Sequence, residues 1–356
     1  MLHGSAPAPT HHSASGRTKT MKKIFPERPG AATSVVRLAG LVIIGVLAVG
    51  ACSSGGAGAY PDKDLAIMAP ADPGGGWDST ARAMQTALQA GITTRNVEVY
   101  NRGGAGGTVG LAEFVETKKG DPHQFMVMGL VMVGAIRTND SQVDLTGVTP
   151  IASLTTEQEA VAVDADSPYQ TFEDLMEAFT ADPQSISWAG GSAGGTDHIL
   201  VGLIAQAKGV APADINYIAH SGGGEALAAI LSGAASAGVS GVSEFTDQVD
   251  AGAMRILAVS GSEAVDGVDA PTIKDSGADV VLENWRGVMA PPDISPEQRD
   301  AAVGLITRMH DGQGWKDALT ANGWTDLFMT GADFDTFLDD ETMRVEEVLR
   351  DIGLIE

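Results

Sequence analysis

In several glycine-rich stretches of this chain, the groups available to bind a ligand are backbone N–H groups rather than side chains. The most pronounced is Pro73–Asp78, whose three consecutive glycines follow the apolar run Leu65–Ala69 and precede a helical pattern. Glycine lets the backbone approach a ligand closely, and the positive end of a helix dipole at the same point favours an anion. Asp78 or Ser79 would cap that helix. The chemistry predicted is binding of a carboxylate, with a tight strand-to-helix connection as the structural alternative.

The elements that must position this loop recur along the chain. Four units share the order strand, glycine-rich loop, helix. After the first, the loops and their strands are Arg102–Gly107 after Val97–Tyr100, Gly190–His198 after Ile186–Ala189, and His220–Gly224 after Ile215–Ala219. In an open α/β sheet such loops gather at the carboxyl ends of the strands, where ligands bind. We therefore predict an α/β fold with parallel sheets covered by helices.

Further elements follow from periodicity and capping signals. Thr171 with Asp174 predicts one helix start, and Ser295-Pro296-Glu297-Gln298 predicts another. The apolar spacing from about Asp333 to Asp351 predicts a terminal helix that packs as a clamp. The remaining predicted strands are Phe125–Gly129, Val148–Leu154, Ala237–Ser240 and Arg255–Val259, with a short helix from near Ser243.

The N-terminal region predicts where the protein works. Residues 1–37 carry six basic residues and one acidic residue, and Leu38–Val49 is a twelve-residue apolar run that ends shortly before Cys52. This is the pattern of a signal peptide, because the run is too short for a transmembrane helix. The flanks of Cys52 resemble a bacterial lipobox, in which the cysteine is lipidated. We expect a signal peptide over 1–51, with Met21 as an alternative start, and a lipidated flexible linker over 52–61.

The mature chain is strongly acidic. Of 22 basic and 46 acidic residues, 16 and 45 remain after residues 1–51 are removed, which gives a net charge of −29. No basic stripe is left to follow a phosphate backbone, so we expect no nucleic-acid partner. An anionic ligand would be repelled by the overall charge, and its capture requires local dipoles and backbone donors. Cys52 is the single cysteine, and the seven histidines have no metal-ligand spacing, so we predict no metal and no cofactor.

Five stretches together resemble one family. They are Ala71–Arg82, Asn101–Gly110, Gly191–His198, Ser221–Leu227 and Trp285–Pro291, and in this order they are similar to the solute receptors of tripartite tricarboxylate transporters. The resemblance covers essentially the whole mature chain. It implies a two-lobed α/β binding protein of the periplasmic type II class, with a mainly parallel sheet flanked by helices in each lobe and a ligand cleft between the lobes.

The resemblance also implies how the lobes divide the chain. The crossings fall near Leu154–Ala160 and near Asp266–Ser276. Lobe 1 would hold residues 62–160 together with 276–356, and lobe 2 would hold 161–275. Each lobe then contributes two of the glycine loops, and the loops face one another across the cleft.

The ligand contacts implied by the resemblance lie in the first and third glycine loops. Trp77 resembles the subgroup associated with citrate-like ligands. Asp78 and Asp197 also fit helix caps, His198 also fits a local structural bond, and Arg82 and Arg102 are candidate positive charges. The predicted ligand-binding residues are Gly74, Gly75, Gly76, Trp77, Asp78, Gly106, Gly129, Ser192, Ala193, Gly195, Thr196 and His198.

Two other classes of function share some of these features. Gly190–Gly194 matches the G-x-S-x-G pattern between a strand and a helix, so a serine hydrolase using Ser192 is one alternative. No oxyanion motif precedes it, and no histidine follows in a triad arrangement, so we predict that the protein is not an enzyme. Gly104, Gly106 and Gly110 depart from the dinucleotide fingerprint by one residue. A lipoprotein that presents its ligand to a membrane sensor is the other alternative.

The prediction is therefore an extracytoplasmic, lipid-anchored receptor for a small di- or tricarboxylate, with a citrate-like ligand favoured. By the resemblance, it delivers this ligand to a permease made of two integral membrane subunits. We expect the receptor to be a monomer.

Overall fold

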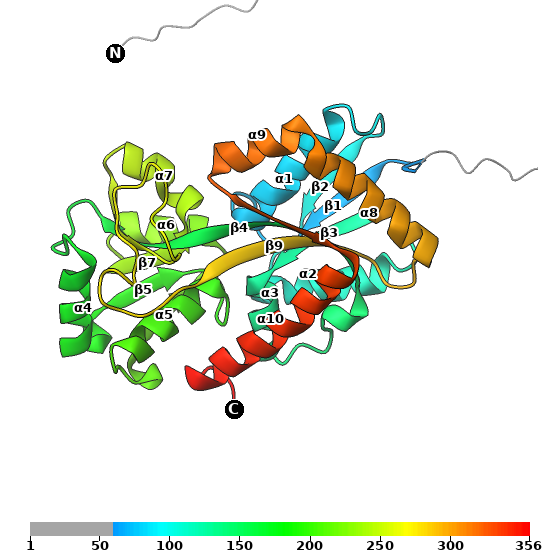
Figure 1. Cartoon of the computed structure of the whole chain (residues 1–356). Coiled ribbons are helices and arrows are strands. Elements are labelled where there is room, and N and C mark those ends of the chain that lie inside the picture. Colours follow the sequence, from blue (N-terminus) through cyan, green and yellow to red (C-terminus); the bar gives the residue numbers. More distant parts are fainter. Residues whose placement is uncertain (1–59) are drawn as a thin grey trace, which may run out of the picture. The chain divides into compact units, whose positions relative to one another are not determined.

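The computed structural model describes residues 60–356. The predicted signal peptide, Cys52 and residues 52–59 of the predicted linker lie outside the described residues. The described chain has an α/β fold with ten strands in the order β2-β1-β3-β9-β4-β7-β5-β6, with β10 and β8 also paired to β4. We call the elements around β1, β2, β3 and β10 lobe 1, and those around β5 to β8 lobe 2. Two long strands, β4 (Thr149–Asp164) and β9 (Glu283–Ala290), run side by side between them (Figure 1).

Lobe 1 begins with a parallel three-stranded sheet. β1 pairs with β2 on one side and with β3 on the other, each in parallel. The first two predicted units are confirmed here, because each strand is followed by a glycine-rich loop and a helix. The elements are β1 (Leu65–Ala69), α1 (Gly76–Gln89), β2 (Val97–Asn101), α2 (Thr108–Thr117), β3 (Gln124–Gly129), α3 (Leu130–Thr138), α8 (Pro296–Asp311), α9 (Gln313–Asn322), β10 (Thr325–Thr330) and α10 (Gly331–Asp351).

Lobe 2 repeats the plan with a second parallel sheet, in which β5 pairs with β6 and with β7. The third and fourth predicted units are confirmed. The elements are α4 (Phe172–Ala181), β5 (Ser187–Gly190), α5 (Thr196–Ala207), β6 (Asn216–Ala219), α6 (Gly223–Leu231), β7 (Ala237–Gly241), α7 (Val242–Asp250) and β8 (Met254–Val259). The capping boxes predicted at Thr171 and Ser295 are both present.

β4 is one continuous strand that extends well beyond the predicted strand Val148–Leu154. Its first part pairs with β9 from Thr149 to Gln158, and its last part pairs with β7 and β8 from Glu159 onward. Because β4 is antiparallel to β7, β8 and β9, and β9 is antiparallel to β3, the sheets are more mixed than the mainly parallel ones we predicted. The exact division of the chain between lobes stays a prediction.

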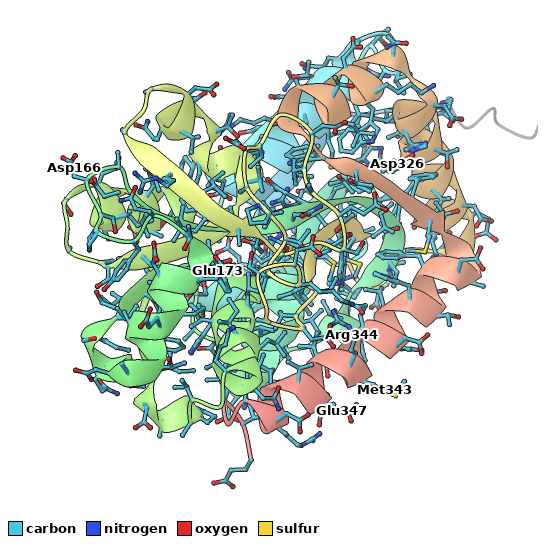
Figure 2. The ribbon with its side chains drawn as sticks, turned by 60° about the vertical axis from the view of Figure 1, so that its left-hand side comes forward. Asp166, Glu173, Asp326, Met343, Arg344 and Glu347 are labelled. Atoms are coloured by element: carbon cyan, nitrogen blue, oxygen red, sulfur yellow. The ribbon has the colours of Figure 1, made fainter. Side chains whose placement is uncertain are left out.

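The sequence pattern did not separate α3, α9, β9 and β10 as elements. α3 continues the apolar run of β3 without a polar break, and a run of this kind does not distinguish a strand from a buried helix. The terminal helix α10 is confirmed, although it starts at Gly331, and it packs on α3, β4 and β10. Val345 and Leu349 lie on its buried face, whereas Met343, Arg344 and Glu347 lie on its outer face (Figure 2).

Candidate ligand-binding site

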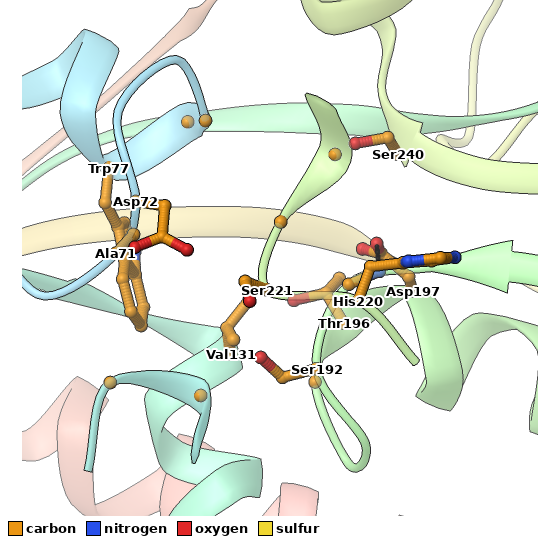
Figure 3. Close-up of a pocket in the computed structure, with 18 of the residues that line it drawn as sticks. Ala71, Asp72, Trp77, Val131, Ser192, Thr196, Asp197, His220, Ser221 and Ser240 are labelled. Carbon is orange, nitrogen blue, oxygen red and sulfur yellow. Dashed lines mark hydrogen bonds between the residues drawn. The ribbon is translucent and has the colours of Figure 1, made fainter. Parts of the chain in front are cut away.

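A cavity of about 380 Å³ lies where the glycine loops of the two lobes meet. Trp77 and Asp72 line it from lobe 1, Ser192 and Ser221 line it from lobe 2, and Val131 at the start of α3 lies between them (Figure 3). The loops predicted to face one another therefore do so. Since each loop follows the carboxyl end of a parallel strand, this is the place where an α/β sheet offers a binding crevice.

Most of the predicted ligand-binding residues line this cavity. Both helices that follow the first and third glycine loops begin at its edge, α1 at Gly76 and α5 at Thr196. Their N-caps are glycines without a side-chain cap, so the expected capping of α1 by Asp78 or Ser79 is wrong. The first N–H groups of a helix have no partner within the helix and are free to bind an anion. The lining residues from our prediction are Gly75, Gly76, Trp77, Gly106, Ser192, Ala193, Gly195 and Thr196.

Gly74 and Asp78 lie outside the cavity lining and hold the first loop in shape. One oxygen of Asp78 accepts hydrogen bonds from Gly74 N at 3.0 Å and from Arg82 Nε at 2.9 Å. The other accepts from Asn101 Nδ2 at 2.9 Å. Gly74 has a φ of 96°, a conformation that glycine adopts without strain. In this structure these two residues position the loop.

Gly129 and His198 also lie outside the lining. Gly129 ends β3, where a Cβ would overlap the carbonyl oxygen of Trp285 on β9. His198 Nδ1 accepts a hydrogen bond from Gly194 N at 3.1 Å, and its ring stacks on Tyr217 at 4.0 Å between centroids. Burial lowers the pKa of His198 to about 4, so the ring is neutral at physiological pH. The local structural bond is the role that the geometry gives it.

Contacts between the lobes surround the cavity. Thr138 Oγ1 on α3 donates to the carbonyl oxygen of Ala193 at 3.3 Å. A Cβ on Gly134 of α3 would overlap the carbonyl oxygen of Gly194, so the lobes meet backbone to backbone. On the other side, Gly76 N donates to Glu244 Oε1 at 3.0 Å. The lobes are therefore joined on both sides of the cavity.

Sequence reasoning missed the polar residues that come from strands or from the helix after β7. These residues, from β7, α7 and β9, lie far from the first and third glycine loops in sequence, and their own motifs contain no glycine run, whereas the other missed residues, except Asn139, lie in or beside the glycine loops. The sequence offered one signal, the single arginine in the apolar stretch Trp285–Ala290, because a charge that becomes buried requires a partner. The missed polar lining residues are Asp72, Asn139, Asp197, His220, Ser221, Glu225, Ser240, Glu244, Asn284 and Arg286.

Arg286 and Glu157 form a buried ion pair beneath the cavity. Arg286 Nη2 lies 2.6 Å from Glu157 Oε2, and both side chains are 2% exposed. Glu157 also accepts from Ser243 N at 2.8 Å, at the start of α7. Arg286 Nη1 has no hydrogen-bond partner among residues 60–356. The pair lies on the two long strands, and its positive member lines the cavity.

Three further carboxyl groups share this buried region, and one arginine does not balance them. Burial, followed by the charge of Asp197, raises the pKa of Glu159. Burial raises the pKa of Asp197 to about 6, although the N–H of Gly191 and the charge of Arg286 act in the opposite direction. Burial, followed by the charge of Glu157, raises the pKa of Glu244 to about 7. Asp197 and Glu244, which line the cavity, therefore keep their protons up to mildly acidic and near-neutral pH, respectively.

The arginines proposed from the sequence have other partners. Arg82, which is exposed, pairs with the buried Asp78, and Arg102 pairs with Glu113 on the surface. Among residues 60–356 no group of three potential metal ligands is found. In the same range no helix is long and apolar enough to span a bilayer.

Ser192 lies on the cavity wall without the partners of a catalytic serine. Within the described chain, neither His198 nor His220 is hydrogen-bonded to its hydroxyl. His198 Nδ1 is engaged by Gly194 N, and His220 Nδ1 lies 4.0 Å from Glu225 Oε2. The nucleophile and base contact that a hydrolase needs is not formed here.

Comparison with known proteins identifies the family. The model of the tripartite tricarboxylate transporter family receptor matches residues 80–354. The chain belongs to this receptor family. The receptor is 24% identical over 334 residues to BugT of Bordetella pertussis, covering 90% of this chain and 98% of that protein.

Two solved structures have the same fold. The periplasmic binding protein BugD superposes with a TM-score of 0.75 at 19% identity, covering 83% of this chain and 99% of that chain. MatC of Rhodopseudomonas palustris, solved with bound malate, superposes with a TM-score of 0.69 at 19% identity. The match covers 82% of this chain and 100% of that chain. The predicted two-lobed α/β architecture is confirmed. The receptor is thus a solute-binding component of a transport system rather than an enzyme.

Proposed function

We propose that this receptor binds a small di- or tricarboxylate in the cavity between its lobes and delivers it to a permease of two integral membrane subunits. The observation that carries the proposal is the convergence of neutral donors from both lobes on one cavity. Ser192, Ser221 and Thr196 contribute hydroxyls, and α1, α5 and α6 all begin at its lining. Hydroxyls and helix N-termini bind an anion without adding a fixed positive charge.

Membership of a tricarboxylate receptor family supports a carboxylate as the ligand. MatC, which shares the fold, was solved with malate, and a compact dicarboxylate is thus one probe. Citrate is the other, because Trp77 resembles the citrate-associated subgroup. The Trp77 ring is 7% exposed, lines the cavity and lies against Gly107, where a Cβ would come within 2.6 Å of it. Trp77 therefore limits ligand size on the lobe 1 side.

Calorimetric titration of the full chain with malate, citrate and succinate tests the proposal. We expect saturable binding of at least one of them, and roughly tenfold weaker binding by Ser192→Ala, because one hydrogen bond to a charged group is lost. Ser232→Ala is the matched control, since Ser232 ends α6 away from the lining and bonds only Ala229 O among described residues. No binding of any carboxylate, together with covalent labelling of Ser192 by a fluorophosphonate, would instead support the hydrolase.

We also propose that the receptor works outside the cytoplasm and is anchored through a lipid on Cys52. Support comes from the apolar run Leu38–Val49 with small residues before Cys52, and from the periplasmic location given for BugD. Cys52→Ser is expected to release the protein from the membrane fraction without altering carboxylate binding. Membrane association that persists in this variant contradicts the anchor.

A further inference from the structure

A carboxylate of the protein itself lies at the N-terminus of α1. Gly76, the first residue of α1 in lobe 1, donates its N–H to Oε1 of Glu244 at 3.0 Å. Glu244 belongs to the first turn of α7 in lobe 2, so this hydrogen bond crosses the cavity from one lobe to the other. The donor that the glycine loop offers to an anion is already used.

Glu244 is held through one oxygen, because its buried Oε2 has no hydrogen-bond partner among residues 60–356. Its second oxygen lies against Gly223, the first residue of α6, where a Cβ would overlap both Glu244 Oε2 and the hydroxyl of Ser240. The carboxylate thus lies between the N-termini of α1 and α6. Both helix dipoles favour a negative charge at this point.

Arg286 supplies the fixed positive charge of the same region. Its guanidinium packs on Gly76, since a Cβ there would overlap Cζ and Nη2. The charged or titratable groups that face Glu244 from neighbouring elements are Glu157 and Glu159 on β4, Arg286 on β9 and Asp197 on α5. Glu157 is bonded to Arg286, which leaves Arg286 Nη1 without a partner among residues 60–356. A ligand carboxylate at the start of α1 would meet the Gly76 N–H that now holds Glu244, with the guanidinium of Arg286 beside it.

We propose that Glu244 is a built-in competitor of the ligand: it occupies the anion site at the N-terminus of α1, and a bound carboxylate reaches that site only by displacing it. This rests on the proposed carboxylate-binding function. Glu244 thereby sets the affinity of the receptor. In the Ser192–Thr196 loop no carboxylate from the opposite lobe occupies the donors, although Gly194 N and Gly195 N have acceptors within lobe 2. Displacement of Glu244 also replaces a direct bond between the lobes by one through the ligand.

The test compares two acidic residues of the same cavity. Glu244→Ala frees Gly76 N, whereas Glu225→Ala removes a carboxylate that also lines the cavity but bonds only within lobe 2, to Ser221 N at 2.9 Å. Titration with malate and citrate at about pH 8 is expected to show roughly tenfold tighter binding by Glu244→Ala, since a charge-assisted hydrogen bond no longer competes. Unchanged or weaker binding by Glu244→Ala overturns the proposal. An equal gain in Glu225→Ala overturns it too, because removed charge alone would then explain the effect.

A second measurement does not depend on a ligand. In protein labelled with ¹⁵N at glycine, the Gly76 amide resonance is expected to move between pH 6 and 8 as Glu244 ionises, and to lose this response in Glu244→Gln. The glutamine variant keeps the side-chain shape where the alanine variant fails to fold. If the Gly76 resonance shows the same pH response in Glu244→Gln as in the parent protein, Glu244 does not occupy the anion site at the start of α1. If the resonance responds but neither probe binds to any variant, the occupied site stands, whereas the carboxylate-receptor function and the competitor role that rests on it both fail.

Discussion

The glycine loops of the two lobes are built alike, but the pKa of the acidic residue in each shifts in the opposite direction. In lobe 1, Asp78 accepts a hydrogen bond from Gly74 N in the preceding loop. In lobe 2, Asp197 accepts one from Gly191 N. Each aspartate lies in the first turn of the helix that follows its loop, and each closes the loop onto that helix.

The neighbours of the two aspartates differ. Burial acts to raise the pKa of Asp78, but hydrogen bonds from Arg82 and Asn101 outweigh it, and the net pKa is lowered. Asp197 has no such cationic hydrogen-bond donor among residues 60–356, and burial raises its pKa to about 6. The same loop design therefore gives a carboxylate in lobe 1 that stays charged to lower pH than usual, and one in lobe 2 that keeps its proton up to mildly acidic pH.

Arg286 lies between these two loops, and its replacement is expected to change the free energy of unfolding more than any other substitution proposed here. Arg286→Gln leaves Glu157 buried without its cation and removes the packing on Gly76. We expect a loss of about 3–5 kcal/mol in the free energy of unfolding, as for other buried pairs that lose one partner. Urea denaturation at neutral pH measures it. Arg82→Gln, which removes the exposed member of the pair at the first loop, is the control, with less than about 1 kcal/mol lost.

Amide variants of the two aspartates should have effects of opposite sign. A lowered pKa means that ionised Asp78 stabilises the fold above its unfolded pKa, a contribution lost as pH falls through the folded value. A raised pKa means that stability falls as pH rises from about 4 to the folded pKa of Asp197, about 6. At about pH 8 we therefore expect Asp78→Asn to destabilise by about 1–2 kcal/mol and Asp197→Asn to stabilise by on the order of 1–3 kcal/mol.

Urea denaturation of both amide variants at about pH 8 and about pH 4 checks this pair. The difference between Asp197→Asn and the parent protein should shrink at the lower pH, where the folded carboxyl is protonated and the unfolded one is about half protonated. Changes of the same sign at about pH 8 would show that the two loops are electrostatically equivalent after all.

The smallest effect concerns the pH dependence of ligand affinity. Because the pKa of Glu244 is raised to about 7, lowering the pH from 8 to 6 converts the proposed competitor into a weaker, neutral one. Malate affinity of the parent protein should then rise by a factor of roughly three, a fraction of one hydrogen bond. Calorimetry of Glu244→Gln over the same range gives the comparison, and an equally steep profile in that variant would assign the effect to Asp197 instead.

Local sequence signals were reliable wherever one segment decides its own structure. The glycine loops at Gly74–Gly76 and Gly191–Gly195, and the capping boxes at Thr171 and Ser295, all occur as predicted. Turn geometry and helix capping depend on residues a few positions apart, which a sequence displays directly. The apolar continuity of β3 into α3 carried no such signal, and the helix was missed.

By itself, the sequence determined the α/β plan, the repeated strand-loop-helix units and most of the loop residues around the cavity. Only the tertiary structure decided which donors of those loops are free. Glu244 meets Gly76 across 168 positions, and Arg286 meets Glu157 across 129. Such pairings arise because β4 and β9 bring both lobes to one point, and burial there changes the pKa of each carboxyl group according to its neighbours. The residue types determine which groups can carry a charge. The distances between these groups in the folded chain decide which of them stay ionised.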